Sequence, residues 1–328
     1  MLSPIDVKST SAFDFYRNAF KEKKKTSYQL SPVAKKYIKE NFSFDLPEID
    51  SVNKSNDGTV KFLLKFKDGK KVEAVALAFH KNYTLCLSSQ VGCAMKCDFC
   101  LTATQGLERN LRDYEIVSQY IKVMMFLRDN NLSHKKPNIV FMGQGEPLHN
   151  FDHLKSAINI LRDRSGLDLA GDKITISTSG YLPGIKRLGE MPAVNMAFSL
   201  HSVNEKVRSK IIPLNKKYPW KECLLELQKN NPSLKKYINI EYLLLKGVND
   251  SVEDAEKLVE ELKDFNYFIN LIPFNPFEGN YHQRPDKDQV EAFRKKLVSL
   301  KVRTMVRTTK GDDILAACGQ LKSKEFQR

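Results

Sequence analysis

Residues 91–102 read VGCAMKCDFCLT and place Cys93, Cys97 and Cys100 in a C-x3-C-x2-C spacing. Three thiolates so close in sequence can hold three irons of a 4Fe-4S cluster and leave the fourth iron open to a small molecule. The alternative is a structural zinc site, but such sites are closed by four ligands and usually contain two C-x2-C pairs or paired histidines. No fourth Cys or His follows nearby. The spacing therefore predicts a reactive iron–sulfur cluster, with Phe99 packed against it.

A second motif supports this prediction. Residues 141–147, FMGQGEP, end an apolar run, so a glycine-rich turn and a carboxylate lie at the carboxyl end of a predicted parallel strand. Ligands bind at this edge in α/β sheets and barrels. Gly145 would let the main chain approach a cofactor, and Glu146 could accept a hydrogen bond from an ammonium group. Together the motifs resemble the radical S-adenosylmethionine superfamily, which implies that the open iron binds the amino and carboxylate groups of S-adenosylmethionine.

Length and composition limit the function. The chain has 328 residues, which suggests two domains or one large barrel with an appendage. Its net charge of +14 favours a polyanion such as RNA over a small metabolite. Residues 1–10 contain no apolar signal region, and the most apolar run, VEAVALAF, is too short to span a membrane. The six cysteines form no evident disulfide framework, and a cluster needs a reducing interior. We therefore expect a cytoplasmic protein without membrane contact.

The sequence pattern changes near residue 79. Before it, residues 11–25 and 31–41 predict two short basic helices, and residues 59–66 and 70–79 predict a β-hairpin. After it, strand and helix patterns alternate, which predicts an α/β fold, and the resemblance implies an incomplete six-stranded barrel. We divide the chain into three parts: a small accessory domain (1–78), a radical S-adenosylmethionine partial barrel (79–308) and a C-terminal segment (309–328).

The predicted barrel strands are 83–87, 138–142, 173–177, 193–200, 238–245 and 268–272. The predicted helices are 113–128, 152–163, 220–230, 252–265 and 289–300, and a last strand, VRTMVRT, covers 302–308. Several residues fall at predicted strand ends, where a turn or helix cap is the simplest explanation. Because the carboxyl ends of parallel strands meet at one face, we expect these residues to contact the cofactor instead. They are Ser177, Ser199, Leu200, His201 and Asn275.

The C-terminal segment KGDDILAACGQL, residues 310–321, indicates a family. Its Cys318 lies among small residues, which suits a mobile exposed loop, although a buried free cysteine is a common alternative. With Cys86 in YTLCLSSQVGC, the cluster motif, the Gly-Glu-Pro turn and FSLHS, it resembles the radical S-adenosylmethionine RNA adenine C2-methyltransferases. These dual-specificity enzymes modify 23S rRNA and some tRNAs. The resemblance covers about residues 57–321. Gln144 stands where we expect Met between the two glycines.

The resemblance implies a role for each remaining cysteine. One S-adenosylmethionine methylates Cys318, and a second serves radical chemistry, because carbon 2 of adenine has no lone pair with which to attack a methyl group. Cys86 then forms a transient disulfide with Cys318, and Glu73 accepts the ring proton. The apolar flanks of Glu73 would raise its pKa toward that of a useful base. The alternative is an outward-facing Glu73 paired with Lys71. Expected partners are 23S rRNA in the peptidyl-transferase region, tRNA at position 37 and an electron donor such as flavodoxin, with the protein a monomer.

Two other functions stay open. An adenine C8-methyltransferase of 23S rRNA shares both extra cysteines, although the intact Gly-Glu-Pro-Leu turn favours carbon 2. A non-catalytic iron–sulfur RNA-binding protein would not need Cys86 and Cys318 together. Cys223 matches no catalytic position, and we expect it in the core. Basic residues predicted at the rim could contact RNA phosphates without a catalytic role. They are Arg109, Arg112, Arg208, Lys210, Lys216 and Lys217.

Overall fold

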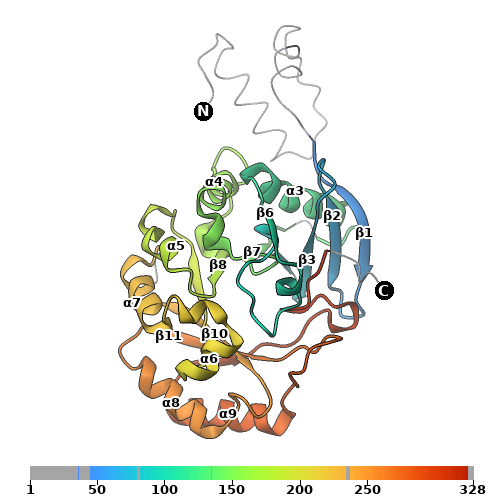
Figure 1. The fold of residues 1–328 in the computed structure, drawn as a ribbon. Helices are drawn as coiled ribbons and strands as arrows, with labels where there is room; N and C mark the ends of the chain where they lie inside the picture. The colour runs from blue at the N-terminus through green and yellow to red at the C-terminus, as the bar shows by residue number, and fades with distance from the viewer. Residues whose placement is uncertain (1–35, 37–44, 80–81, 134, 234–236, 324–328) are drawn as a thin grey trace.

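The computed structural model describes residues 36, 45–79, 82–133, 135–233 and 237–323. Apart from Lys36, the two predicted N-terminal helices lie outside these residues. The described chain forms one large sheet with helices packed around it and a small two-stranded sheet (Figure 1). None of the helices in this part of the chain is long and apolar enough to cross a membrane.

The large sheet has ten strands in the order β1-β2-β3-β4-β7-β8-β9-β10-β11-β12. Neighbouring strands from β4 onward are parallel, whereas β1 to β4 pair antiparallel. The strands are β1 (Glu48–Lys54), β2 (Val60–Lys65), β3 (Lys71–Phe79), β4 (Asn82–Cys86), β7 (Asn138–Phe141), β8 (Ile174–Thr178), β9 (Asn195–Ser199), β10 (Ile238–Leu244), β11 (Tyr267–Pro273) and β12 (Thr304–Val306). The predicted α/β class with a mostly parallel sheet is confirmed. Closure into a six-stranded partial barrel stays a prediction.

The helices connect the parallel strands and pack apolar faces on the sheet. Those predicted from the sequence agree with the structure within three residues at each end: α3 (Asp113–Asp129), α4 (Phe151–Arg162), α7 (Trp220–Asn230), α8 (Val252–Leu262) and α9 (Lys287–Ser299). In α8, Ser251 and Asp254 form a capping box, and the helix buries Ala255, Leu258 and Leu262 at helical spacing. The short helices α5 (Leu182–Lys186) and α6 (Glu205–Ile211) were not predicted. Cys223 of α7 is fully buried, as expected.

The N-terminal hairpin is continuous with the large sheet. β2 and β3 form the predicted hairpin, and β3 also pairs with β4. The sequence did not predict β1, because EIDSVNK is polar and largely exposed at the sheet edge. The boundary predicted after residue 78 falls near the end of β3 and stays a prediction.

The remaining elements are short and lie in the connections. The two-stranded sheet consists of β5 (Gln90–Gly92) and β6 (Leu107–Asn110). The 3-10 helices are η1 (Leu101–Gln105), η2 (Pro147–Asn150), η3 (Gly171–Lys173), η4 (Leu188–Glu190), η5 (Pro213–Lys216) and η6 (Asp312–Ile314). β5 and η1 enclose the cysteine motif, so this loop is anchored at both ends.

Candidate active site

The three cysteines of the C-x3-C-x2-C motif lie on the loop between β5 and η1. Cys93 donates its N–H to the Gly106 carbonyl at 3.0 Å, and Cys100 donates to the Cys97 carbonyl at 3.2 Å. Gly92 adopts a φ of 76°, and a Cβ at this position would lie 1.8 Å from the Gly106 oxygen. A side chain is therefore excluded at Gly92, and the loop can turn tightly beside the first cysteine.

The thiols of this loop share one electrostatic environment. Burial is the main cause that raises the pKa of each thiol, and it raises the pKa of Cys93 to about 12. Negative charge on Cys100 and Cys93 further raises the pKa of Cys97, and the Glu146 carboxylate acts in the same direction. Thiolates crowded together in this way need a bound cation to remain deprotonated.

The glycine-rich turn after β7 brings Glu146 beside the cysteine loop. Glu146 donates its N–H to Gln90 Oε1 at 2.8 Å, and a Cβ on Gly145 would lie 2.6 Å from the Gln90 Cβ. The Glu146 carboxylate accepts from the Leu148 N–H at 3.1 Å and from the Ser179 N–H and hydroxyl at 2.9 and 2.8 Å. Burial raises the pKa of Glu146, and these hydrogen bonds oppose the rise. The turn therefore fixes the Glu146 carboxylate beside Gly145, which has no side chain.

The strand-end residues predicted from the sequence lie at the same edge. The hydroxyl oxygens of Ser177 and Ser199 are 3.4 Å apart at the ends of β8 and β9. Leu200 is fully buried, and the His201 ring packs edge-on against Phe99 with centroids 5.0 Å apart. Burial lowers the pKa of His201 to about 3, so this imidazole is neutral. Phe99 therefore joins the cysteine loop to the end of β9.

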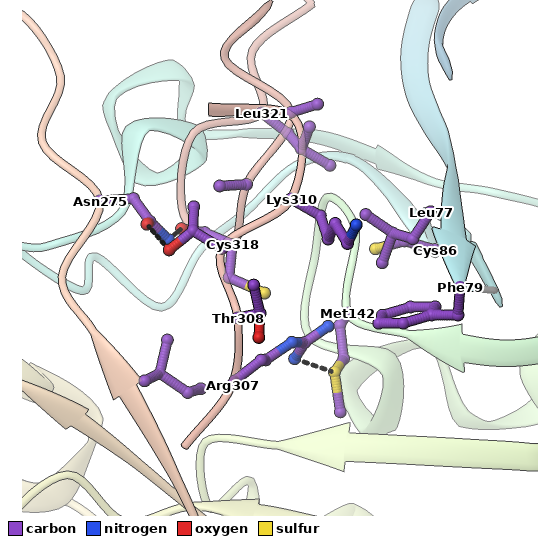
Figure 2. Close-up of a pocket in the computed structure, with 14 residues that line it drawn as sticks. Leu77, Phe79, Cys86, Met142, Asn275, Arg307, Thr308, Lys310, Cys318 and Leu321 are labelled. Carbon is purple, nitrogen blue, oxygen red and sulfur yellow. Dashed lines mark hydrogen bonds between the residues drawn. The ribbon is translucent and has the colours of Figure 1, made fainter. Parts of the chain in front are cut away.

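Cys86 and Cys318 line one pocket between β4 and the C-terminal segment (Figure 2). Burial raises the pKa of Cys86 to about 12; negative charge on Cys318 adds to the rise and Arg307 opposes it. Arg307 follows β12 and lines the same pocket, and the negative charge of Cys318 is the main cause that raises its pKa. Asn275 donates its side-chain N–H to the Cys318 carbonyl at 3.3 Å. The pocket therefore combines two thiols with one guanidinium.

Glu73 lies on β3, 5% exposed, and faces the protein interior. Its Oε1 is 3.1 Å from the Lys61 Nζ, and its Oε2 accepts the Lys322 N–H at 2.7 Å. Burial raises the pKa of Glu73, and the charge of Lys61 opposes the rise. Lys71 pairs instead with Asp50 at 2.8 Å. The alternative of an outward-facing Glu73 paired with Lys71 is therefore wrong.

Comparison with known proteins identifies the family. The family model described as the radical SAM superfamily matches residues 87–262. The dual-specificity RNA methyltransferase RlmN of Bradyrhizobium diazoefficiens is 44% identical over 88% of this chain and 74% of its own length. The protein of the same name from Rhizobium leguminosarum bv. trifolii is 42% identical over 98% and 80%. A crystal structure of a radical SAM methyltransferase from Sphaerobacter thermophilus covers 96% of this chain and 93% of its own, with a TM-score of 0.89 and 32% identity.

The chain belongs to the dual-specificity RNA methyltransferase family of the radical SAM superfamily. Radical SAM enzymes use a 4Fe-4S cluster and S-adenosylmethionine, and the site fits both. Three neighbouring thiols are available, and in the described ranges no group of three His, Cys, Asp or Glu side chains is placed to hold a single metal ion. Ligands that each hold a different iron need not converge on one point. Gly143, where a Cβ would lie 2.7 Å from the Leu87 carbonyl group, lets the turn that carries Glu146 pack directly against the main chain that follows β4.

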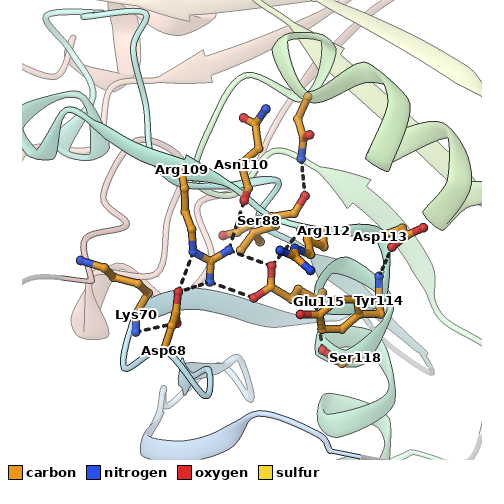
Figure 3. Close-up of polar contacts among 12 residues, drawn as sticks. Asp68, Lys70, Ser88, Arg109, Asn110, Arg112, Asp113, Tyr114, Glu115 and Ser118 are labelled. Carbon is orange, nitrogen blue, oxygen red and sulfur yellow. Dashed lines mark hydrogen bonds and ion pairs between the residues drawn. The ribbon is translucent and has the colours of Figure 1, made fainter. Parts of the chain in front are cut away.

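Some arginines expected at the RNA-binding rim of this radical SAM enzyme are used inside the fold instead. Arg109 pairs with Glu115 at 2.8 Å and with Asp68 at 2.7 Å, joining the β2–β3 turn to α3 (Figure 3). Arg208 is fully buried and donates to the carbonyls of Ser199 and Ser179 at 2.9 and 2.8 Å. The prediction that these two arginines grip phosphates is wrong, because their donors are already used. The other predicted rim residues are exposed: Arg112, Lys210, Lys216 and Lys217.

Two charged residues at this site, Arg307 and Glu241, were not predicted from the sequence. Arg307 comes directly after β12, so the rule that identified the other strand-end residues would have found it. Glu241 lies on β10, 3% exposed, and its Oε1 accepts from the Asn270 side chain at 3.0 Å. Burial raises the pKa of Glu241, and Arg307 opposes the rise. Nothing in the local sequence indicates this carboxylate, because IEYLL reads as an ordinary buried strand.

Proposed function

We propose that this RNA methyltransferase modifies carbon 2 of adenine, in the peptidyl-transferase region of 23S rRNA and at position 37 of tRNA, with Cys318 as the methyl carrier. The observation that carries the proposal is the pocket shared by Cys318 and Cys86. A binding protein without catalysis would have no use for a second thiol beside the first. The relatives are named for dual specificity, which agrees with two classes of RNA substrate.

The cofactors would be held at the carboxyl edge of the parallel strands. When bound, the cluster and S-adenosylmethionine supply the methyl group and the one-electron chemistry that an electron-poor ring carbon requires. Cys93, Cys97 and Cys100 would hold the cluster. The residues proposed to bind S-adenosylmethionine are Gly145, Glu146, Ser177, Ser199, Leu200, His201 and Asn275. Their common position at this edge, beside the cysteine loop, supports the assignment.

The side chains of the pocket would then release the product. Cys318 Sγ carries the one-carbon group that becomes bonded to the base. Glu73 accepts the ring proton, and the Cys86 thiolate attacks Cys318 Sγ to form a transient disulfide. The bond between sulfur and carbon breaks, and the carbon keeps the electron pair and takes up a proton as the methyl group of the product. The raised pKa of Glu73, caused by burial, supports its role as a base.

The proposal extends to the organisation of the chain. Residues 1–78 would form an accessory domain, residues 79–308 a partial barrel and residues 309–328 the segment of the methyl carrier. The continuous run of parallel strands supports the barrel. The protein would work in the cytoplasm as a monomer and receive electrons from a carrier such as flavodoxin.

Nucleoside mass spectrometry tests this function directly. We expect 2-methyladenosine to disappear from 23S rRNA and tRNA in cells that lack the protein and to return when the chain is restored. Loss of 8-methyladenosine instead would identify a C8-methyltransferase. Unchanged RNA would favour the non-catalytic iron–sulfur protein.

A further inference from the structure

Gln144 holds the main chain of Glu73, directly at the N–H and through Ser88 at the carbonyl. It is fully buried in the turn after β7. Its Oε1 accepts the Glu73 N–H at 3.1 Å. Its own N–H donates to Ser88 Oγ at 2.9 Å, and that hydroxyl donates to the Glu73 carbonyl at 2.6 Å. Gln144 therefore binds the Glu73 N–H directly and reaches the Glu73 carbonyl through Ser88.

The other end of the Gln144 side chain reaches the C-terminal segment. Its Nε2 donates to Gln105 Oε1 at 2.9 Å and lies 3.4 Å from Ser323 Oγ. Gln105 also donates to Ser323 Oγ at 3.2 Å. The preceding residue, Lys322, donates its N–H to the Glu73 carboxylate at 2.7 Å. Glu73, Gln144 and the residues that follow Cys318 thus form one hydrogen-bonded unit.

We propose that Gln144 is a positioning residue that fixes Glu73 relative to the segment that carries Cys318. A proton acceptor must be held within a fraction of an ångström of its working position, by neighbours that are themselves fixed. An amide is suited to this place because one end accepts from Glu73 while the other donates toward Gln105 and Ser323. Met, which we expected here, has a similar length but can replace none of these hydrogen bonds.

The inference rests on the proposed role of Glu73, so the test includes that residue. Full-length enzyme loaded with its cofactors is allowed to form the covalent RNA complex, and the release of RNA is followed on denaturing gels per methylated Cys318. Gln144→Met is expected to slow release about tenfold, as for the loss of one buried hydrogen bond of ordinary strength. Gln228→Met, an exposed glutamine on α7, is the matched control and should release at the parent rate. Glu73→Gln should block release.

Hydrogen–deuterium exchange gives a readout that does not depend on activity. In protein without RNA, Gln144→Met should exchange the amides of residues 319–323 faster than the parent, whereas Gln228→Met should not. Ser323→Ala is the milder variant if Gln144→Met does not fold, and it should accelerate the same amides and slow release. If Glu73→Gln blocks release while Gln144→Met, or failing that Ser323→Ala, behaves as the parent in both assays, the positioning role is overturned alone. If Glu73→Gln releases RNA normally, the proton-acceptor role fails, and the inference fails with it.

Discussion

Two thiols and one guanidinium line the pocket to which we assign the methyl carrier. Cys86 ends β4, Cys318 lies in the C-terminal segment, and Arg307, which follows β12, lines the pocket with them (Figure 2). A guanidinium keeps its charge at any physiological pH, so it opposes the rise in the pKa of the buried Cys86. The raised pKa of Arg307, caused first by Cys318, expresses the same attraction from the side of the cation. Arg307 therefore favours the Cys86 thiolate, which we propose attacks the sulfur of Cys318.

Variants of Cys86 and Cys318 should be blocked at different steps of the proposed reaction. Cys86→Ala is expected to form the covalent RNA complex and to accumulate it, because no second thiol can attack the sulfur of Cys318 and release the carbon bound to it. Cys318→Ala should form no complex, and the double variant should behave like Cys318→Ala, since residues that act in sequence on one intermediate are not additive. Denaturing gels before and after nuclease measure the complex. Cys223→Ala, in the core, is the control for loss of a thiol alone. A complex on Cys318→Ala would refute the carrier assignment.

Release should show a pH dependence that follows from Glu73, the proposed proton acceptor, and its neighbour Lys61. Glu73 must be ionised to accept a proton, so the rate of release should rise with pH through its raised pKa. Lys61 lowers that pKa, and Lys61→Met should therefore move the rising limb of the profile to higher pH. Lys71→Met, two residues before Glu73 on β3 and paired with Asp50, should leave the limb in place. Single-turnover release measured across pH in both variants tests this. Equal profiles for the two variants would argue against Glu73 as the base.

The helices and strands that could be predicted are those with a clear local sequence pattern. Buried strands and amphipathic helices carry period-two and helical patterns, so the parallel strands and the long helices were predictable. β5 and β6 were not, because each is short and depends on pairing across the cysteine loop. The residues of the candidate site also differ in whether a local sequence signal could reveal them. The cysteine motif and the glycine turn are local, whereas the contact of Glu73 with Lys322 joins residues 249 positions apart. Such a contact exists only after the chain has folded.

The link between the hairpin and α3 should be important for stability (Figure 3). Arg109→Met leaves the Glu115 carboxylate, 6% exposed, without its main partner. We expect a loss of about 1–3 kcal/mol in the free energy of unfolding, the usual cost of an unpaired buried polar group. Arg187→Met breaks an exposed pair with Asp152 and should change stability little. Denaturant unfolding of both variants measures the difference. Equal stability would show that the Arg109 pair contributes no more than a surface pair.

The net charge of the whole chain favours RNA as a partner. The fold places some of the positive side chains near the candidate site. The chain carries a net charge of +14. α6 and η5 follow the end of β9, and Asp98 of the cysteine loop donates its N–H to the Ile211 carbonyl at 3.1 Å. The exposed Lys216 and Lys217 therefore lie at η5, in the connection after β9 that contacts the cysteine loop. Because Arg109 and Arg208 are used inside the fold, these lysines are better placed to meet phosphates.

RNA binding should lose part of its salt dependence when these lysines are removed. Each phosphate contact on a single strand contributes about 0.7 to the slope of log affinity against log salt. The double variant Lys216→Ala, Lys217→Ala should therefore bind RNA more weakly at low salt and have a shallower slope, whatever the RNA sequence. The matched control is Lys257→Ala, Lys263→Ala, which removes the same charge from exposed positions at α8. Filter binding across a salt series measures both slopes. If the two double variants share one slope, the effect belongs to net charge, and the η5 connection makes no specific phosphate contact.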